Sequence, residues 1–275
     1  AFASDERMIV VDDVLSCLQQ LAKHHRKQFN IPVLAITGSN GKTTTKELIS
    51  AVLSAHYLTC TTKGNLNNHI GVPLTILQIQ PSTEIAVIEM GANHIGEIAQ
   101  LCSIAQPTHG IITNIGKAHL EGFGSYEGVI QAKSELYQFI QSTGGHLFVN
   151  HNDALLMQLS EKIKRFTYGN NCDSYRIFQY MPAHPYAEVH DITKSPEKKI
   201  IIQSKLIGSY NNPNIAAAAT IGAFFEVDSN AIKTAIAEYT PSNNRSQIVK
   251  TKTNEIILDA YNANPSSMTV ALDNF

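Results

Sequence analysis

The chain has 275 residues, of which 43% are hydrophobic and 16% are charged, so it can bury a sizeable core in one or two domains. Its formal net charge is -2, and it has no polybasic block, so we expect neither a nucleic-acid partner nor an anionic membrane surface as partner. No apolar run approaches the ~20 residues that a membrane-spanning helix needs, and we expect no membrane insertion.

The first predicted elements form a strand, turn and helix unit. Residues 12–29 carry apolar positions at helical spacing, and residues 31–36 read as a short buried strand. The glycine-rich segment 37–44 follows, with the sequence Thr-Gly-Ser-Asn-Gly-Lys-Thr-Thr. A second helical pattern then runs through Leu48 and Val52.

The alternation of strands and helices continues through the middle of the chain. Strands are predicted at 85–89, 110–114 and 146–150, with helices at 95–102 and 126–140 between them. Strands alternating with helices of this length indicate right-handed βαβ units. The fold class predicted is therefore α/β, with a mostly parallel sheet flanked by helices.

Polar segments follow three of these strands. They are the glycine-rich segment 38–44, Glu89 and residues 114–119. Ligands of open parallel sheets bind outside the carboxyl ends of the strands. We therefore expect these three segments to meet at one edge of the sheet.

The character of the sequence changes after about residue 170. Pro182, Pro185 and Pro196 interrupt short strand-like runs between residues 170 and 207, which predicts a smaller antiparallel sheet. Further elements are predicted downstream: helices at 214–225 and 229–239, and strands at 246–250 and 255–259.

The glycine-rich segment predicts a phosphate site. Small residues let the backbone wrap an anion with its N–H groups, Lys42 can neutralise phosphate charge, and the Thr43 hydroxyl can ligate Mg²⁺. The strict G-x-x-x-x-G-K-[ST] pattern fails, because Ile36 stands five residues before Gly41. A glycine-rich turn with an incidental lysine is the alternative. The candidate nucleotide contacts are Gly38, Ser39, Asn40, Gly41, Lys42, Thr43 and Thr44.

Other polar residues are open to two interpretations on the sequence alone. Glu89 is either a Mg²⁺ ligand or a solvated carboxylate at a strand end. His119 alone reads as a packed or surface histidine, Lys133 as a solvated helix lysine, and Arg245 as a surface residue of a polar loop. The asparagine-rich segment 62–74 is typical of a turn.

The glycine-rich segment, continued by Thr45-Lys46-Glu47, resembles the ATP loop of the Mur ligase family. The resemblance runs from about residue 12 to residue 272. Residues 89–98, which read Glu-Met-Gly-Ala-Asn-His-Ile-Gly-Glu-Ile, resemble the branch of the family that adds D-alanyl-D-alanine.

This resemblance implies a reaction. The enzymes are cytoplasmic bacterial ligases of peptidoglycan synthesis, which supports cell-wall biogenesis, cell shape and cell division. ATP would phosphorylate the terminal carboxylate of UDP-N-acetylmuramoyl-tripeptide, and the amine of D-alanyl-D-alanine would attack the acyl phosphate and release phosphate. A monomer is expected.

The resemblance also implies site roles. Two Mg²⁺ are expected, with Thr43, Glu89 and His119 as metal-binding residues and with a carbamate on Lys133 supporting the site. Lys42, Lys133, His119 and Arg245 are the catalytic candidates. Asn65, Asn67 and Asn68 match a segment at the rim of the family's active site, which makes them candidates for substrate contact.

The far end of the nucleotide is expected near residues 208–214, which read Gly-Ser-Tyr-Asn-Asn-Pro-Asn. The family commonly has G-x-H-N-x-x-N here. Asn211 and Asn214 match the residues that lie near the adenine, whereas Tyr210 replaces the histidine. Arg245 corresponds to an arginine that reaches the terminal phosphate, and Asp259 to an aspartate that contacts the nucleotide.

Three domain segments follow from the resemblance. Residues 1–30 would be a linker helix leading from a domain that holds the UDP end of the substrate. Residues 31–258 would be the central ATP-binding domain, and residues 259–275 the start of a C-terminal Rossmann-like domain. We therefore expect a piece of a longer protein that does not turn over alone.

Two alternatives remain at this point. One is another Mur-type ligase, such as a folylpolyglutamate synthetase or an enzyme that adds a different amino acid. The other is a P-loop NTPase switch that acts on a protein partner. The switch would have an aspartate at the strand position where this chain has Glu89.

Overall fold

The computed structural model describes residues 8–117, 120–171, 173–241, 247–258, 268–269 and 272. Within that part of the chain a nine-stranded sheet has the order β2-β3-β1-β4-β5-β6-β7-β8-β9. Its strands are β1 (Val33–Thr37), β2 (Thr59–Thr61), β3 (Ile85–Glu89), β4 (His109–Ile112), β5 (His146–Asn150), β6 (Arg165–Gly169), β7 (Arg176–Tyr180), β8 (Tyr186–Asp191) and β9 (Ile200–Ile207).

Helices flank this sheet. They are α1 (Val14–Arg26), α2 (Lys42–Ser54), α3 (Gly71–Ile76), α4 (Glu97–Ala105), α5 (Leu120–Phe123), α6 (Tyr126–Thr143), α7 (Ala154–Leu159), α8 (Asn212–Phe224) and α9 (Ser229–Glu238). Two short 3₁₀ turns, η1 (Pro196–Lys198) and η2 (Ser209–Asn211), lie on either side of β9. None of the helices described is long and apolar enough to cross a membrane.

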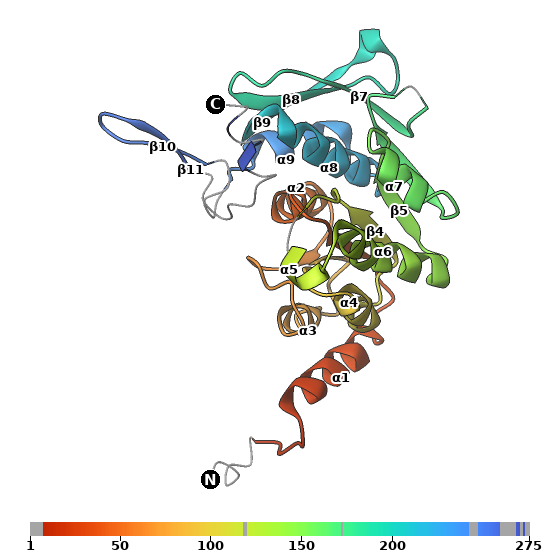
Figure 1. Ribbon diagram of the computed structural model, residues 1–275. Helices are drawn as coiled ribbons and strands as arrows, with labels where there is room; N and C mark the ends of the chain where they lie inside the picture. The colour runs from red at the N-terminus through yellow and green to blue at the C-terminus, as the bar shows by residue number, and fades with distance from the viewer. Residues whose placement is uncertain are drawn as a thin grey trace.

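The predicted α/β class with a mostly parallel sheet is confirmed. Neighbouring strands from β2 to β7 run parallel, and β8 is antiparallel to both of its neighbours, β7 and β9. The antiparallel strands extend the main sheet, because β7 pairs with β6 through Tyr168 and Arg176. A separate antiparallel pair, β10 (Gln247–Lys250) and β11 (Glu255–Leu258), projects from the body (Figure 1).

Two hydrophobic clusters cover the two faces of the sheet. Alternate residues of a strand point to opposite faces, so Val33 and Ala35 of β1 join the cluster under α3, α4 and α6. Leu34 and Ile36 join the cluster under α2, α8 and α9. All five residues of β1 are buried, as expected for a strand covered on both faces.

The strand register places the expected polar segments at one edge. Ile36, near the end of β1, is opposite Glu89, the last residue of β3. Thr37 is opposite Ile112, the last residue of β4. The carboxyl ends of three adjacent strands therefore open onto one place, as predicted.

Candidate active site

The loop between β1 and α2 has a backbone that depends on two glycines. Gly38 has φ 142°, and a Cβ there would lie 2.1 Å from Thr113 Oγ1. Gly41 precedes α2 with φ 78°, in the left-handed region, and a Cβ there would lie 3.0 Å from Asn214 Oδ1. The loop is thus shaped by positive φ angles and by close approach of neighbouring segments.

Residues after β4 hold this loop from the side. Ser39 N donates to Asn114 O over 3.0 Å, and Asn40 N donates to Asn114 Oδ1 over 3.1 Å. Thr113 Oγ1 donates to Asn40 O over 2.6 Å. The expected meeting of these segments is confirmed, whereas the roles of Thr113 and Asn114 as braces of the loop were not foreseen.

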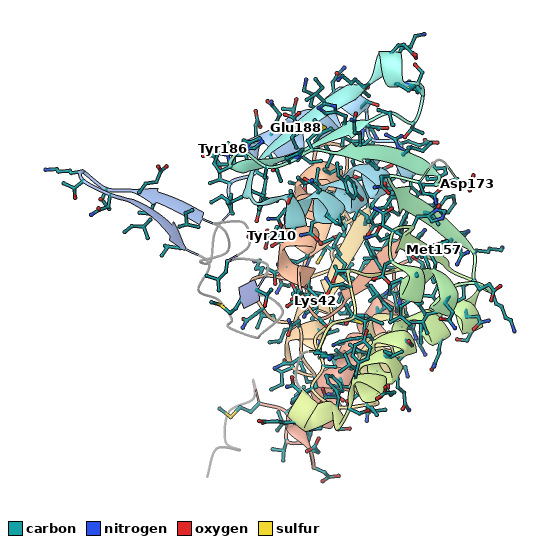
Figure 2. All side chains as sticks on the ribbon, turned by 45° about the horizontal axis from the view of Figure 1, so that its top comes forward. Lys42, Met157, Asp173, Tyr186, Glu188 and Tyr210 are labelled. Carbon is teal, nitrogen blue, oxygen red and sulfur yellow. The ribbon has the colours of Figure 1, made fainter. Side chains whose placement is uncertain are left out.

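Lys42 begins α2 and folds back over the loop. Its Nζ donates to Gly38 O at 2.8 Å and to Ser39 O at 3.1 Å. The ammonium therefore lies against the concave backbone and adds positive charge there. Lys42 is labelled near the middle of the molecule in Figure 2.

Glu89 is the buried carboxylate of the site, with 1% of its surface exposed. Its Oε1 accepts hydrogen bonds from Thr43 Oγ1 at 3.2 Å and from Asn67 Nδ2 at 2.7 Å. Its Oε2 is buried without a hydrogen-bond partner among the described residues, and so is Thr37 Oγ1 on the neighbouring strand. Burying an unsatisfied carboxylate oxygen is costly, so such an atom calls for a partner.

These oxygen atoms fit a magnesium ion. Mg²⁺ prefers oxygen ligands, and in nucleotide sites one or two protein groups, phosphates and waters complete its shell. Thr43 Oγ1 and Glu89 Oε2 are groups of this kind. The described residues contain no group of three His, Cys, Asp or Glu side chains that could hold a metal.

Lys133 lies in α6 with 2% of its surface exposed. Burial, followed by the charge of Lys42, lowers its pKa to about 7, although Glu97 and Glu135 oppose the shift. Its Nζ lies 5.4 Å from the centre of the Phe123 ring. The solvated surface lysine considered from the sequence is therefore wrong, and near neutral pH a large fraction of this amine is unprotonated and nucleophilic.

The two predicted adenine-side asparagines form a chain of hydrogen bonds with the start of α2. Thr45 Oγ1 donates to Asn214 Oδ1 at 3.1 Å, and Asn214 Nδ2 donates to Asn211 Oδ1 at 2.9 Å. Asn211 Nδ2 in turn donates to Ile207 O at 2.8 Å. Residues far apart in the sequence are thereby placed beside the glycine-rich loop.

The three asparagines predicted to contact substrate have different positions. Asn67 bonds directly to Glu89, as described above. Asn68 Oδ1 accepts from Ile70 N at 3.1 Å and Gly71 N at 2.9 Å, which holds the start of α3. Asn65 is exposed. The structure brings Asn67 into the site and gives Asn68 a structural role.

Three predicted site residues, His119, Arg245 and Asp259, lie outside the described residues. Their assigned roles stay predictions.

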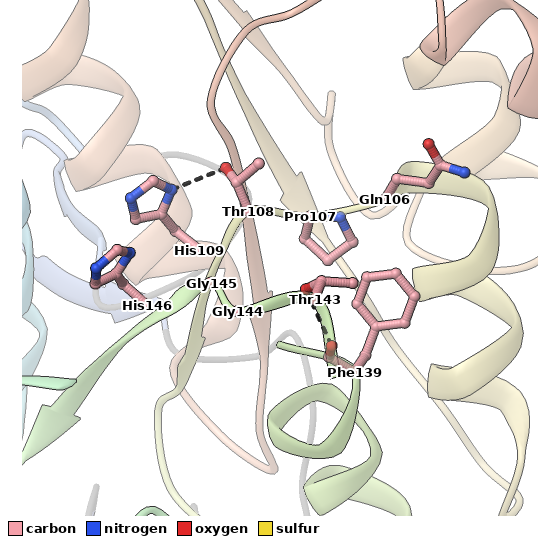
Figure 3. Close-up of a pocket in the computed structure, with 9 residues that line it drawn as sticks. All are labelled: Gln106, Pro107, Thr108, His109, Phe139, Thr143, Gly144, Gly145 and His146. Carbon is pink, nitrogen blue, oxygen red and sulfur yellow. Dashed lines mark hydrogen bonds between the residues drawn. The ribbon is translucent and has the colours of Figure 1, made fainter. Parts of the chain in front are cut away.

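A hollow of about 540 Å³ lies at the opposite edge of the sheet, where β4 and β5 begin (Figure 3). Its lining residues are Gln106, Pro107, Thr108, His109, Phe139, Thr143, Gly144, Gly145 and His146. None is acidic, and burial and then the neighbouring His146 lower the pKa of His109 to about 4. This hollow is separate from the glycine-rich loop, which lies at the carboxyl ends of the strands.

The protein-family comparison gives the class of the protein. Residues 36–222 match the model of the Mur ligase middle domain, which is more than half of the chain. The chain therefore belongs to the Mur ligase family.

Individual relatives are similar over almost the whole chain. It is 38% identical over 267 residues to UDP-N-acetylmuramoyl-tripeptide--D-alanyl-D-alanine ligase of Bacillus subtilis, covering 96% of this chain and 57% of the relative. It is 36% identical to the Escherichia coli protein of the same name, covering 98% of this chain and 60% of the relative. The chain thus spans less than two thirds of the length of these relatives.

Solved structures of MurF proteins are similar to this chain as well. MurF from Acinetobacter baumannii superposes with a TM-score of 0.87 at 32% identity, covering 97% of this chain and 59% of that one. MurF ligase from Thermotoga maritima, solved in complex with ADP, superposes with a TM-score of 0.84 at 26% identity, covering 100% of this chain and 64% of that one.

Proposed function

We propose that this chain carries the ATP and Mg²⁺ site of a ligase that joins D-alanyl-D-alanine to UDP-N-acetylmuramoyl-tripeptide in peptidoglycan precursor synthesis. The observation that carries the proposal is the buried Glu89 carboxylate, held by Thr43 beside the glycine-rich loop with one oxygen unpartnered among the described residues. The names of the most similar relatives support the substrates, and the ADP in the Thermotoga maritima structure supports the nucleotide.

The residues of the chain suit an acyl-phosphate mechanism. The loop N–H groups and Lys42 would hold the phosphates, and catalysis of such transfers is mostly positioning and charge stabilisation. Thr43 and Glu89 would hold a Mg²⁺, which would neutralise phosphate charge. Asn211 and Asn214 would lie toward the base, and Arg245 toward the terminal phosphate.

Lys133 would carry a carbamate. The neutral amine attacks CO₂ and releases one proton, so the uncharged nitrogen becomes part of an anionic carbamate. The lowered pKa of about 7 supports this step, because an ordinary lysine is almost fully protonated at neutral pH. The proposal also includes a second Mg²⁺ bound with the help of His119, a monomeric state and a location in the bacterial cytoplasm.

The domain division expected from the sequence is part of the proposal. A preceding domain would bring the UDP-linked carboxylate, and a following domain would bring the incoming amine. The 275-residue chain would then bind ATP without turning over both co-substrates.

The test is phosphate release by the longer protein with Mg-ATP and the UDP-tripeptide, with and without D-alanyl-D-alanine. Release that needs both co-substrates, with a matching mass gain on the UDP-peptide, would support the ligase. Release from ATP alone, indifferent to both, would favour an NTPase switch. Absence of release would direct the search to other amino acids or folates as acceptors.

A further inference from the structure

We propose that Lys46 is a positioning residue of the metal site, which acts through Asn67 on Glu89. The inference rests on the proposed function, because it concerns the same site. Lys46 lies in α2, one helical turn after Thr43, and its side chain is fully buried. It therefore cannot touch a nucleotide in the way that Lys42 can.

The buried ammonium is directed at one loop. Lys46 Nζ donates to Thr62 O at 2.7 Å and to Gly64 O at 3.2 Å, and it pairs with Glu47 Oε1 at 2.7 Å. Burying a lysine is costly unless its donors are satisfied. Two of its three partners are backbone carbonyls of the segment that leads to Asn67, so Lys46 ties that segment to α2.

The loop held in this way contacts Glu89 at two points and Gly91 at a third. Thr62 Oγ1 accepts from Glu89 N at 3.0 Å, and Asn67 Nδ2 donates to Glu89 Oε1 at 2.7 Å. Asn67 O accepts from Gly91 N at 2.8 Å. A Cβ at Gly91 would lie 2.8 Å from Asn67 Oδ1, so the loop is packed directly against the strand end.

Both hydrogen bonds to Glu89 Oε1 therefore depend on α2. Thr43 supplies one directly, and Lys46 supports the other through the loop. With Oε1 held from both sides, Oε2 is left in a fixed direction for a metal ion. Groups that orient a metal ligand commonly change metal affinity by about 10- to 100-fold when removed.

The experiment uses the 275-residue chain and measures ATP affinity by calorimetry, first in EDTA and then across a Mg²⁺ titration. We expect Mg²⁺ to tighten ATP binding by the wild-type chain. Lys46→Met should reduce this Mg²⁺ effect by about 10-fold or more, with metal-free ATP affinity within about 2-fold of wild type. Lys46→Arg, which keeps a cation with N–H donors, should restore part of the effect.

Arg26→Met is the matched control. Arg26 is also a buried cation whose guanidinium donates to backbone carbonyls, including those of Phe29 and Ala105, but it lies at the end of α1. It should lower the melting temperature and leave the Mg²⁺ effect unchanged. Loss of the Mg²⁺ effect in Arg26→Met as well would show that the readout follows general stability and would overturn the inference.

Asn67→Ala keeps the inference testable should the Lys46 variants fail to fold. It should reproduce the Mg²⁺ defect, and combining it with Lys46→Met should add little, because both changes remove one support of Glu89. An unchanged Mg²⁺ effect in Asn67→Ala, or additive defects in the pair, would overturn the route through Asn67. A wild-type chain that binds ATP without any Mg²⁺ effect would instead overturn the proposed metal site, and the role of Lys46 with it.

Discussion

The buried amine of Lys133 should lower the stability of the fold in a pH-dependent way. Its pKa is lowered from 10.5 to about 7 in the folded chain, mainly by burial. Between these two values the unfolded chain keeps a proton that the folded chain has released, so the free energy of unfolding rises with pH. Below pH 7 both states are protonated, and the folded state carries the whole cost of the buried charge.

The size of this effect follows from the shift. One pKa unit corresponds to about 1.4 kcal/mol, so a change from 10.5 to about 7 sets an upper limit of about 5 kcal/mol. The side chain is only 2% exposed, so solvent screens little of it. Replacing Lys133 by Met removes the charge and keeps an apolar stem, and it should stabilise the chain below pH 7 by several kcal/mol.

Urea denaturation of wild type and Lys133→Met between pH 6 and pH 9.5, in buffer free of CO₂, measures the difference. The two curves should converge as pH rises, by up to about 1.4 kcal/mol per pH unit above pH 7. Lys162→Met, at an exposed lysine, should run parallel to wild type. Parallel curves for Lys133→Met would refute the argument that burial keeps this amine partly neutral.

Three further changes test other parts of the structure. The pKa of His109 is lowered from 6.5 to about 4, so as pH falls below 6.5 the unfolded state takes up a proton that the folded state does not. The free energy of unfolding should therefore fall by up to about 1.4 kcal/mol per pH unit in this range. Urea denaturation should show a smaller slope for His109→Asn and an unchanged slope for His69→Asn, which alters an exposed histidine. Gly38→Ala should lower the melting temperature and weaken ATP binding about 10-fold or more, because the added Cβ would lie 2.1 Å from Thr113 Oγ1. Gly124→Ala is its control, since Gly124 also has a positive φ but has open space around it. That change should lower the free energy of unfolding by about 1 kcal/mol and leave ATP binding intact. Glu89→Gln should keep or raise the melting temperature, because it removes a buried charge, and should abolish the Mg²⁺ effect on ATP affinity in calorimetry.

Local patterns were enough to predict the centre of the fold. The strand before the glycine-rich segment and the helix after it were foreseen because apolar spacing and glycine positions are readable within about 20 residues. The meeting of the loop, Glu89 and Asn114 followed from parallel topology, because carboxyl ends of adjacent strands share one edge. The joining of β7 to β6 was not foreseen, since pairing between strands depends on contacts that no local pattern encodes.

The supports of the site were harder to predict than its centre. Lys46 is a charged residue on a helix, which usually indicates a solvated position, and its burial depends on a loop that packs over it. Asn67 was expected at the rim with two neighbouring asparagines, and nothing in the composition of that segment singles out the one that reaches Glu89. The sequence offered one indication of the role of Lys46, because it stands one helical turn after Thr43 and therefore lies on the same face of the helix.

Helix α2 connects these observations. Within its first five residues Lys42 contacts the glycine-rich loop, Thr43 contacts Glu89, Thr45 contacts Asn214, and Lys46 contacts the loop that carries Asn67. Each contact reaches a different segment, so the helix sets their relative positions. Thr43→Val and Asn67→Ala both remove a hydrogen bond to Glu89 Oε1, so their effects on Mg²⁺ affinity should be non-additive. Either should add to a substitution at Thr45, because Thr45 contacts Asn214 and does not share Glu89 as a partner.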